Sequence, residues 1–309
     1  MKRYFFKRFL NSLLTILLIA TVTFFMMRAI PGGPFTREKP VPEEIMKALN
    51  AKYNLDAPLI VQYFDYMKGL VTFNLGPSFS RVGVSVNDLI IQGFPQTAKV
   101  GFLAVLLIII LGVPTGIISA LRQNRPIDYT VMFMATLGVA IPRFVLATLY
   151  VYIFAGILGW VPTFGLKTPI AYIGPVIALC GYSLSFTARL TRSSMLEVLR
   201  QDYIRTARAN GLRSLSVIGK HAMKNALIPV VTYLGPTIAA IMTGSFIIER
   251  IFAIPGIGRY FVEGVANRDY TVIMGVTVLY ASFYVFMVFI VDVLYAFIDP
   301  RIRFEGRSR

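Results

Sequence analysis

The chain has 309 residues, of which 56% are apolar and 15% are charged, and its mean hydropathy is +0.67. These values exclude an ordinary soluble globular protein and indicate an integral membrane protein. The net charge of +16 does not indicate a nucleic-acid partner, because Lys and Arg residues gather beside apolar runs, where they fix membrane topology and contact lipid. The single cysteine, Cys180, excludes an internal disulfide.

Six apolar runs are long enough to cross a bilayer, which needs about 20 residues per helix. They comprise residues 9–30, 101–121, 129–158, 170–187, 227–248 and 272–298. The first run is too long for a signal peptide and no small-residue cleavage site follows it, so we expect it to remain as an anchor. The sequence therefore predicts an all-α membrane protein with six transmembrane helices.

The distribution of positive charge predicts the orientation of these helices. Of the 31 Lys and Arg residues, 18 lie in the N-terminal segment, the loops at 122–125 and 189–229, and the C-terminal tail. The positive-inside rule then places both termini in the cytoplasm. We expect an anchor helix (1–30), an extracytoplasmic helical loop (31–99) and a five-helix core (100–309) with a cytoplasmic loop at 189–229.

This cytoplasmic loop contains eight Lys or Arg residues and two acids. Within it, residues 203–210 are predicted to form a short helix, with Asp202 as N-cap and Gly211 at the C′ position. The helix carries Tyr203, Ile204 and Ala207 between Arg205 and Arg208, as an exposed apolar knob in a basic frame. Topology and contact with anionic lipid explain the charge. They do not explain a capped helix in the middle of a loop, which indicates that a partner docks there.

The loop at 31–99 is too long to be a simple connector. Residues 42–53 have helical apolar spacing, and Pro58 is suited to open a second helix. Ser85 and Asp88 have the spacing of a capping box. Two interpretations remain open: a small helical cap that packs on the rest of the chain, and a platform for an external partner.

Irregular backbone is predicted at two places near the membrane. Pro142 interrupts the third run, and Arg143 follows it at about mid-membrane depth for a straight helix. After Glu249, the Pro255-Gly256-Ile257-Gly258 segment combines a Pro-Gly turn with apolar neighbours. This segment is either a packed surface turn or backbone that re-enters the membrane, where its glycines permit a tight turn. In the second run, Gly112 and Gly116 form a GxxxG pattern that permits close approach of another helix.

Nothing in the sequence indicates an enzyme. The chain has no P-loop motif, so any ATP must be handled by another chain. The one histidine, His221, cannot form a metal site or a catalytic triad alone. We therefore predict no catalytic residues, no metal site and no cofactor.

The 205–211 (RTARANG) and 221–225 (HAMKN) segments resemble the cytoplasmic signature loop of ABC importer permeases. The first triplet of that signature is usually Glu-Ala-Ala, whereas this chain has Arg205-Thr206-Ala207. The departure is typical of the peptide-importer branch. Further segments resemble the B-type permease subunit of the oligopeptide and nickel importer family: residues 24–28, 31–32, 75–78, 243–245, 255–258, 267–270, 291–295 and 299–301.

The resemblance implies a type I permease fold with six helices in a bacterial cell membrane. It also implies a second homologous permease, two cytoplasmic ATP-binding subunits and an extracytoplasmic peptide-binding protein. The short cytoplasmic helix would be the coupling helix that contacts the ATPase, with the residues Tyr203, Ile204, Arg205, Ala207, Arg208 and Gly211. Candidate residues of the gate or translocation path are Arg143, Glu249, Pro255, Gly256 and Gly258.

Other functions remain open at this stage. Related importers carry nickel, heme or opines, and substrate choice rests mainly with the external binding protein. An ion-coupled secondary transporter would use ionisable residues within its spans, for which Arg143 and Asp292 are the candidates. A membrane scaffold without transport is the third alternative, against which the Gly and Pro breaks within the spans argue.

Overall fold

The computed structural model describes residues 2–35 and 43–298 of the chain. The described residues are helical apart from turns, loops and one isolated β-bridge between Pro77 and Ser85. The chain forms two compact units: unit 1 comprises Met1–Thr97 and Pro255–Arg309, and unit 2 comprises Ala98–Ile254. Pro42 at the start of the predicted 42–53 helix, the 299–301 segment and the side chain of Asp292 lie outside the described parts.

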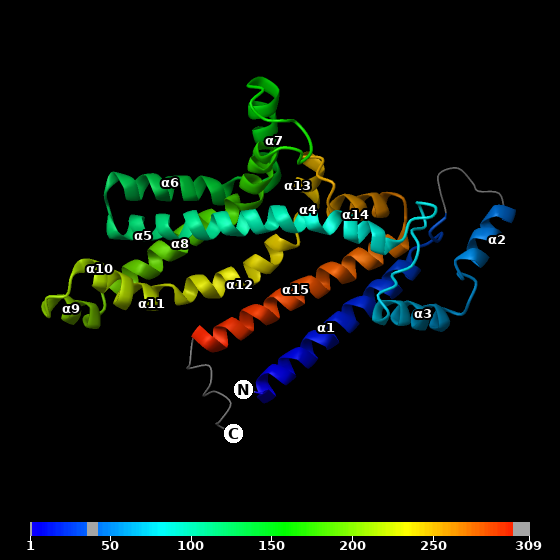
Figure 1. Cartoon of the computed structure of the whole chain (residues 1–309), viewed down its shortest axis with the longest axis horizontal. Helices are drawn as coiled ribbons and strands as arrows, with labels where there is room; N and C mark the ends of the chain where they lie inside the picture. The colour runs from blue at the N-terminus through cyan, green and yellow to red at the C-terminus, as the bar shows by residue number, and fades with distance from the viewer. Residues whose placement is uncertain (1, 36–42, 299–309) are drawn as a thin grey trace. The chain divides into compact units, whose positions relative to one another are not determined.

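Unit 1 is built around the pairing of its first and last helices, α1 and α15, which lie side by side (Figure 1). Its core consists of two groups of buried side chains, one with Val86 and Ile257 and the other with Phe24 and Tyr270. The helices are α1 (Lys2–Ala29), α2 (Glu43–Lys52), α3 (Leu59–Val71), the start of α4 (Val86–Leu107), α14 (Ile257–Ala266) and α15 (Tyr270–Ile298).

Unit 2 is organised around α8, which contacts α5, α6, α7 and α12. Its largest core cluster includes Val100, Ile108, Leu179 and Ile241. After the end of α4, the elements are η1 (Ile108–Gly112), α5 (Val113–Leu121), α6 (Pro126–Ala140), α7 (Arg143–Tyr150), η2 (Val151–Ile157), η3 (Pro169–Tyr172), α8 (Ile173–Leu199), α9 (Asp202–Ala209), α10 (Ser214–Ser216), η4 (Val217–Ala222), α11 (Met223–Ala226), α12 (Ile228–Met242) and α13 (Phe246–Ile251).

Among the described residues, four helices are long and apolar enough to cross a membrane, and the number rises to six if each of two bent pairs is one span. One pair bends by 53° where α11 meets α12. The other bends by 102° between α6 and α7, where Ile141 is extended, as residues before proline usually are. The predicted third run is therefore not one straight helix. The mid-membrane depth expected for Arg143 stays a prediction, because the bend lies after α6, the helix along which that depth is counted.

Three helices do not end where the predicted apolar runs end. The helix that contains the second run begins at Val86 rather than 101, because α4, η1 and α5 form one continuous helical stretch of 36 residues, Val86–Leu121. The fourth continues past 187 to Leu199, so the basic loop begins inside a helix. The fifth ends at Met242, before Gly244 adopts a left-handed conformation with φ of 78°. Hydropathy locates apolar runs, whereas helices continue into polar sequence.

The local signals in the 31–99 segment are confirmed. α2 and α3 occupy the two predicted helical stretches, and Pro58 directly precedes α3. The capping box is reciprocal: Asp88 N–H donates to Ser85 Oγ at 3.1 Å, and Ser85 N–H donates to Asp88 Oδ2 at 3.2 Å.

The GxxxG pattern of Gly112 in η1 and Gly116 in α5 allows the close approach of another helix, as predicted, and that helix is α8. A Cβ atom on Gly116 would lie 2.5 Å from the carbonyl oxygen of Ala188 and 2.6 Å from Cβ of Thr191. Because the nearest atom is backbone, the helices would have to separate to admit a methyl group.

We expect Gly116→Ala to destabilise the protein by about 1–3 kcal/mol, the range for overpacking a tight contact. Thermal unfolding of the purified protein measures this effect. Gly219→Ala is the matched control, because a Cβ at Gly219 would meet nothing within 4 Å. Equal melting temperatures for the two variants would contradict the close packing of α5 on α8.

Candidate functional site

The predicted coupling helix is present as α9, but it begins one residue earlier than expected. Its N-cap is Gln201, and Asp202 is the first helical residue, so the assignment of Asp202 as N-cap is wrong. The carboxylate of Asp202 instead lies 3.5 Å from Arg205, with both side chains exposed. The prediction for Gly211 is confirmed, since its φ is +74° and the N–H groups of Gly211 and Leu212 donate to the carbonyls of Arg208 and Ala207. This pattern is a Schellman motif.

The apolar side chains of α9 face its own chain. Ile204 is fully buried and Ala207 nearly so, in a cluster with Met195, Val217 and Ala222. The expectation that Ile204 and Ala207 form an exposed knob is therefore wrong, because residues three apart share a helix face and this face packs inward. Tyr203 is partly exposed, and its hydroxyl accepts a hydrogen bond from Asn225 Nδ2 at 2.8 Å.

The exposed side of this region carries leucines that sequence reasoning missed. Leu215 is 86% exposed and Leu212 is 43% exposed. The only sequence signal was that both are single leucines between polar residues or glycine, within four residues after the C′ glycine. We define the loop-end surface as the exposed side chains of Tyr203, Arg205, Arg208, Leu212, Arg213 and Leu215.

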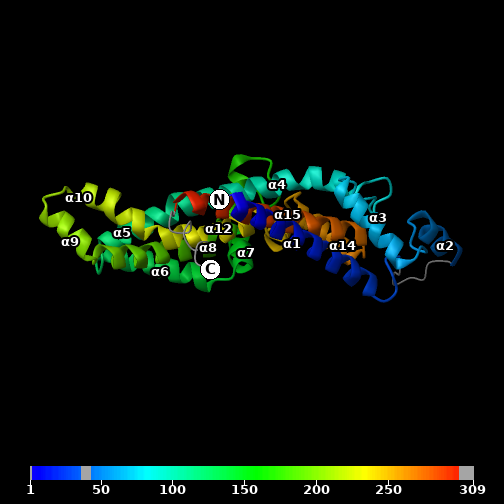
Figure 2. The same cartoon turned by 90° about the horizontal axis from the view of Figure 1, so that it is seen from below.

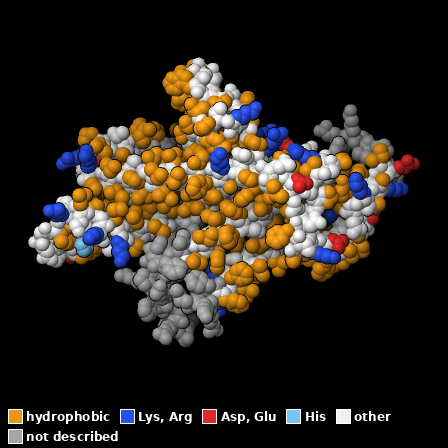
Figure 3. Space-filling view, in the orientation of Figure 1, with side chains coloured by type: hydrophobic (Ala, Val, Ile, Leu, Met, Phe, Trp, Pro, Cys, Tyr) orange, Lys and Arg blue, Asp and Glu red, His pale blue; other side chains and the backbone are white. Residues whose placement is uncertain are grey.

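The loop-end surface lies at one end of unit 2. Figure 1 and Figure 2 both show α9 and α10 together there. Ala120, at the end of α5, belongs to the same buried cluster as Ile204. Figure 3 shows Lys and Arg side chains and the one histidine among uncoloured atoms in this region. Exposed leucines surrounded by Lys and Arg side chains are suited to contact a protein surface that carries apolar and acidic groups.

A buried ion pair stabilises the helices next to this surface. Asp128 at the start of α6 is 1% exposed, and its carboxylate accepts two hydrogen bonds from the Arg192 guanidinium of α8, at 2.6 and 2.7 Å. It also accepts from Ser119 Oγ and, at 2.9 Å, from the N–H of Asn124. In the sequence, Arg192 is one of the eight Lys and Arg residues of the 189–229 segment, whose charge indicates topology. The structure gives it a specific role in joining α6 to α8.

We expect Asp128→Asn to lower the stability of the protein by about 3 kcal/mol, because it leaves the Arg192 guanidinium partly buried without its carboxylate. The melting temperature of the purified protein measures this loss. Asp202→Asn is the control, because it removes an ion pair between exposed side chains and should leave the melting temperature unchanged. A similar melting temperature for both variants would show that the buried pair does not stabilise the helices.

Arg143 is the first residue of α7, directly after the 102° bend. Its guanidinium lies 3.4 Å from Ser183 Oγ and 5.7 Å from the ring centre of Tyr182, both on α8. No carboxylate of the described residues forms an ion pair with it. The half-buried guanidinium of Arg143 therefore has more N–H donors than the Ser183 hydroxyl and the Tyr182 ring can satisfy.

The other predicted gate residues are divided between the units. Glu249 is buried on α13 of unit 2, and Pro255, Gly256 and Gly258 belong to unit 1. Gly256 is the N-cap of α14 with a φ of −97°, and Gly258 is buried within that helix. Neither glycine has the positive φ that favours glycine, since the positive φ in this stretch, 48°, belongs to Ala253; the expected tight turn stays a prediction.

Comparison with known proteins identifies the family. The model of the binding-protein-dependent transport system inner membrane component matches residues 112–304, and the model of the N-terminal part of such membrane components matches residues 1–101. This chain belongs to that family. The match to residues 112–304 alone covers more than half of the permease.

Named relatives are similar along their whole length. This permease is 49% identical over 308 residues to the dipeptide transport system permease protein DppB of Bacillus subtilis (strain 168), with all of both chains covered. It is 47% identical to the oligopeptide transport system permease protein OppB of Escherichia coli (strain K12), covering 98% of this chain and 100% of that one. The resemblance stated from the sequence is confirmed.

A solved structure supports the fold. An inward-facing structure of the MetNI methionine ABC transporter matches with a TM-score of 0.58, covering 68% of this chain and 96% of that chain at 20% identity. Identity this low supports the fold alone. The predicted fold class, an all-helical ABC importer permease, is confirmed.

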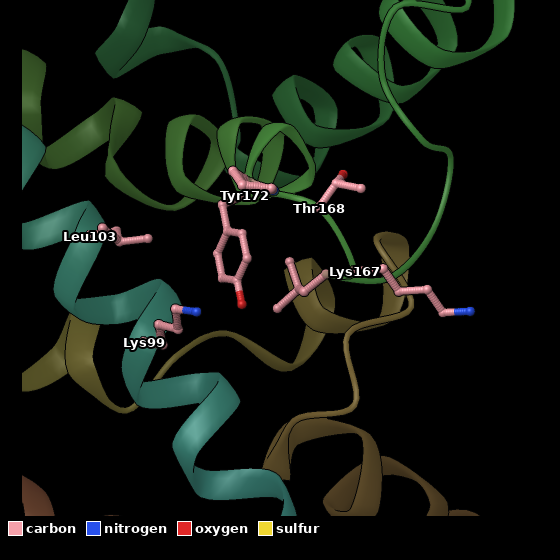
Figure 4. A pocket seen from close by; sticks show the side chains of 7 residues that line it. Lys99, Leu103, Lys167, Thr168 and Tyr172 are labelled. Carbon is pink, nitrogen blue, oxygen red and sulfur yellow. The ribbon is translucent and has the colours of Figure 1, made fainter.

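Unit 2 of the permease contains a cavity of about 370 Å³. The side chains of Lys99 of α4 and Tyr172 of η3 point toward one another at its wall (Figure 4), with the Lys99 ammonium 4.6 Å from the centre of the Tyr172 ring. Lys167 also lines the cavity, but its side chain points away from Lys99. Of the two lysines that line the cavity, Lys99 therefore already has a cation–π contact, with the ring of Tyr172.

Asp269 joins two segments of unit 1 that are distant in the sequence. Its fully buried carboxylate accepts hydrogen bonds from the Ser78 and Ser80 hydroxyls and the Ser80 N–H, and from the N–H of Val272 at the start of α15. Burial raises the pKa of Asp269, but the hydrogen bonds from Ser78 and Ser80 outweigh burial and hold the pKa below its ordinary value.

A carboxylate with a lowered pKa stabilises the folded state above its ordinary pKa, about 3.9. This stabilisation is lost as the pH falls through the still lower pKa of the folded state. We expect the melting temperature of Asp269→Asn to lie below that of the parent between pH 7 and 5, and the difference to shrink below about pH 4. A difference that stays constant down to pH 3 would contradict the role of the ionised carboxylate.

Proposed function

We propose that the chain is the permease subunit of an ATP-driven importer for oligopeptides in a bacterial inner or plasma membrane. It forms the translocation path with a second, homologous permease, and an external binding protein delivers the peptide. Two separate cytoplasmic subunits bind and hydrolyse ATP, and both termini of the permease are cytoplasmic. The full-length identity to dipeptide and oligopeptide permeases supports the substrate class.

The observation that carries the coupling role is the two-sided character of α9. Ile204 and Ala207 anchor the helix to the buried cluster, whereas Tyr203, Arg205 and Arg208 are exposed for contact with the ATP-binding subunit. Of the six predicted coupling residues, Ile204 and Ala207 therefore anchor the helix rather than contact the ATP-binding subunit. Gly211 ends the helix so that Leu212 and Leu215 join the exposed surface.

The contacts around α9 provide a route from the loop-end surface to the spans. Tyr203 is hydrogen-bonded to Asn225 of α11, and Ile204 packs in the same cluster as Met195 of α8. The Asp128–Arg192 pair then connects α8 to α6. A displacement of α9 by the ATP-binding subunit would thus move α8, α11 and α6 together, because packed helices move as rigid elements.

We assign Arg143 and Glu249 to the translocation path and Pro255, Gly256 and Gly258 to the outer gate or the docking surface for the binding protein. The unmatched hydrogen-bonding capacity of Arg143 supports a path role, because a cation in a span is stable where it faces protein or water. In this proposal the 31–99 segment is extracytoplasmic and the 189–229 segment cytoplasmic.

Uptake by the reconstituted complex tests this function. Proteoliposomes are prepared with both permeases and the ATP-binding subunits, and the binding protein is added on the opposite side of the membrane from those subunits. They should accumulate a radiolabelled dipeptide or tetrapeptide only when ATP is present on the side of the ATP-binding subunits. Accumulation of nickel or heme but of no peptide would show that the proposed substrate class is wrong. Uptake driven by an ion gradient without ATP would replace the whole proposal with a secondary transporter.

A further inference from the structure

Helix α3 of unit 1 exposes a row of apolar side chains, which we call the α3 strip. Ile60, Phe64 and Val71 are exposed, and the half-buried Met67 lies between Phe64 and Val71. Their spacing of four, three and four residues places these four side chains on one face of the helix. The apolar face of a helix is normally covered by another element, yet no residue of α3 is fully buried. The α3 strip therefore needs an occupant.

Two exposed charged residues distinguish another side of α3. Lys68 lies at the edge of the α3 strip and Asp65 lies further round the helix, since successive residues are about 100° apart. A cation beside an apolar helix face is typical of helices at a bilayer surface. There the lysine stem lies along apolar groups while the ammonium reaches the headgroups. This pattern favours lipid as the occupant.

The contacts of α3 place it beside the last part of a helix that can cross the membrane (Figure 1). The hydroxyl of Tyr63 lies 2.9 Å from Oγ1 of Thr21, and the rings of Tyr63 and Tyr66 lie 5.5 and 5.6 Å from the ring of Phe24. Phe24 precedes the end of α1, Ala29, by about 8 Å along the helix axis. A bilayer-surface helix buries its apolar face about 5–10 Å into the boundary between headgroups and acyl chains, which matches this level.

The exposed apolar surface is continuous from α1 to the α3 strip. Val22, Phe25 and Met26 are exposed on α1. The ring of Tyr63 stacks on Phe25 at 5.5 Å and meets the ring of Phe64 edge-on at 5.6 Å. Since lipid surrounds the exposed apolar side chains of a transmembrane helix, the same lipid reaches Phe64 across the ring of Tyr63.

We propose that α3 lies at the membrane surface, with the α3 strip among the acyl chains of the leaflet that surrounds the C-terminal end of α1. Lys68 then lies at the level of the headgroups. In the orientation proposed above, this is the outer leaflet. The proposal goes beyond the import function and separates two uses of the 31–99 segment: α3 anchors the segment in lipid, and its apolar face is not a platform for an external protein.

Spin labels at two neighbouring positions of α3 test this proposal. Phe64→Cys and Asp65→Cys are made separately in a Cys180→Ala background, which removes the one native cysteine. The complex of both permeases and the ATP-binding subunits is labelled and reconstituted into vesicles of phosphatidylethanolamine and phosphatidylglycerol. Electron paramagnetic resonance measures collisions of each label with oxygen, which concentrates among acyl chains, and with a water-soluble nickel chelate present on both sides of the membrane.

The ratio of oxygen to nickel collisions should be about tenfold higher at residue 64 than at residue 65, because only the first label lies among acyl chains. Asp65→Cys is the matched control, since its parent side chain is also exposed but lies off the α3 strip. Val71→Cys supplies a second label on the strip and should behave like Phe64→Cys. The side chain of Val71 is 80% exposed, so this change removes no internal packing.

Equal access of the nickel chelate to residues 64, 65 and 71 would overturn the proposal, because the α3 strip would then face water. Protection of residues 64 and 71 from both oxygen and nickel would also overturn it, because protein would then cover the strip. Nickel access that is lost only when the external binding protein is added would assign the strip to that protein instead of lipid. None of these outcomes depends on peptide uptake, so failure of this proposal is distinct from failure of the proposed function.

Discussion

Replacing Leu215 with aspartate is expected to abolish ATP-dependent uptake while leaving the permease folded. Leu215 is 86% exposed, so the change removes no internal packing. At a docking surface, loss of a central apolar side chain together with burial of a new charge weakens binding by about 2 kcal/mol or more, or roughly 30-fold. Co-purification of the ATP-binding subunit and uptake into proteoliposomes measure the two consequences.

The neighbouring residue provides the control for this variant. Ser214 is also exposed, and Ser214→Asp introduces the same charge while retaining the leucine. It should reduce association of the ATP-binding subunit far less than Leu215→Asp. If Leu215→Asp binds that subunit and drives uptake like the parent, the loop-end surface is not the coupling site.

The second large effect is expected from Arg143→Ser. This change removes a cation from the start of α7 but preserves a small polar side chain near Ser183. If Arg143 lines the path, the variant inserts and assembles normally, and uptake of lysine-containing peptides rises about tenfold relative to aspartate-containing ones, because one repulsive charge in a low-dielectric site is worth about 1–2 kcal/mol.

Competition uptake with peptides of opposite charge measures this preference. Arg143→Lys is the matched control, since it retains the charge and should retain the parental preference. Loss of the permease heterodimer in Arg143→Ser would instead identify Arg143 as the partner of an acid on the second permease. A variant that assembles and transports every peptide like the parent would contradict both roles.

Local sequence signals predicted local structure well. Gly211 at the end of α9, the Ser85–Asp88 capping box and the close approach at Gly116 were all foreseen. Each depends on residues within one turn of helix or on one small side chain. The sequence pattern therefore contains the physical cause of each feature.

Features that depend on distant residues could not be predicted in this way. The helical spacing of Ile204 and Ala207 indicates that they share a face, but not that Met195 and Val217 cover that face. Asp128 and Arg192 are 64 residues apart in the sequence, and no local pattern pairs them.

Helix ends near the membrane were mispredicted for a different reason. Hydropathy reports where lipid-compatible sequence lies, but backbone hydrogen bonding continues a helix into polar sequence, as at Asn87 and Asp88 of α4. The break at Pro142 was predicted from the missing N–H of proline. Its 102° angle was not, because packing of α7 on α8 sets the angle.

Cross-linking at residue 215 tests the central claim, that the ATP-binding subunit docks on the loop-end surface. Leu215→Cys and Val82→Cys are placed separately in a Cys180→Ala background, where the two parent side chains are 86% and 85% exposed and lie in different units. A short thiol-to-amine cross-linker should join Leu215→Cys, but not Val82→Cys, to the ATP-binding subunit in the assembled complex. Cross-linking of Val82→Cys but not Leu215→Cys to that subunit would contradict the account.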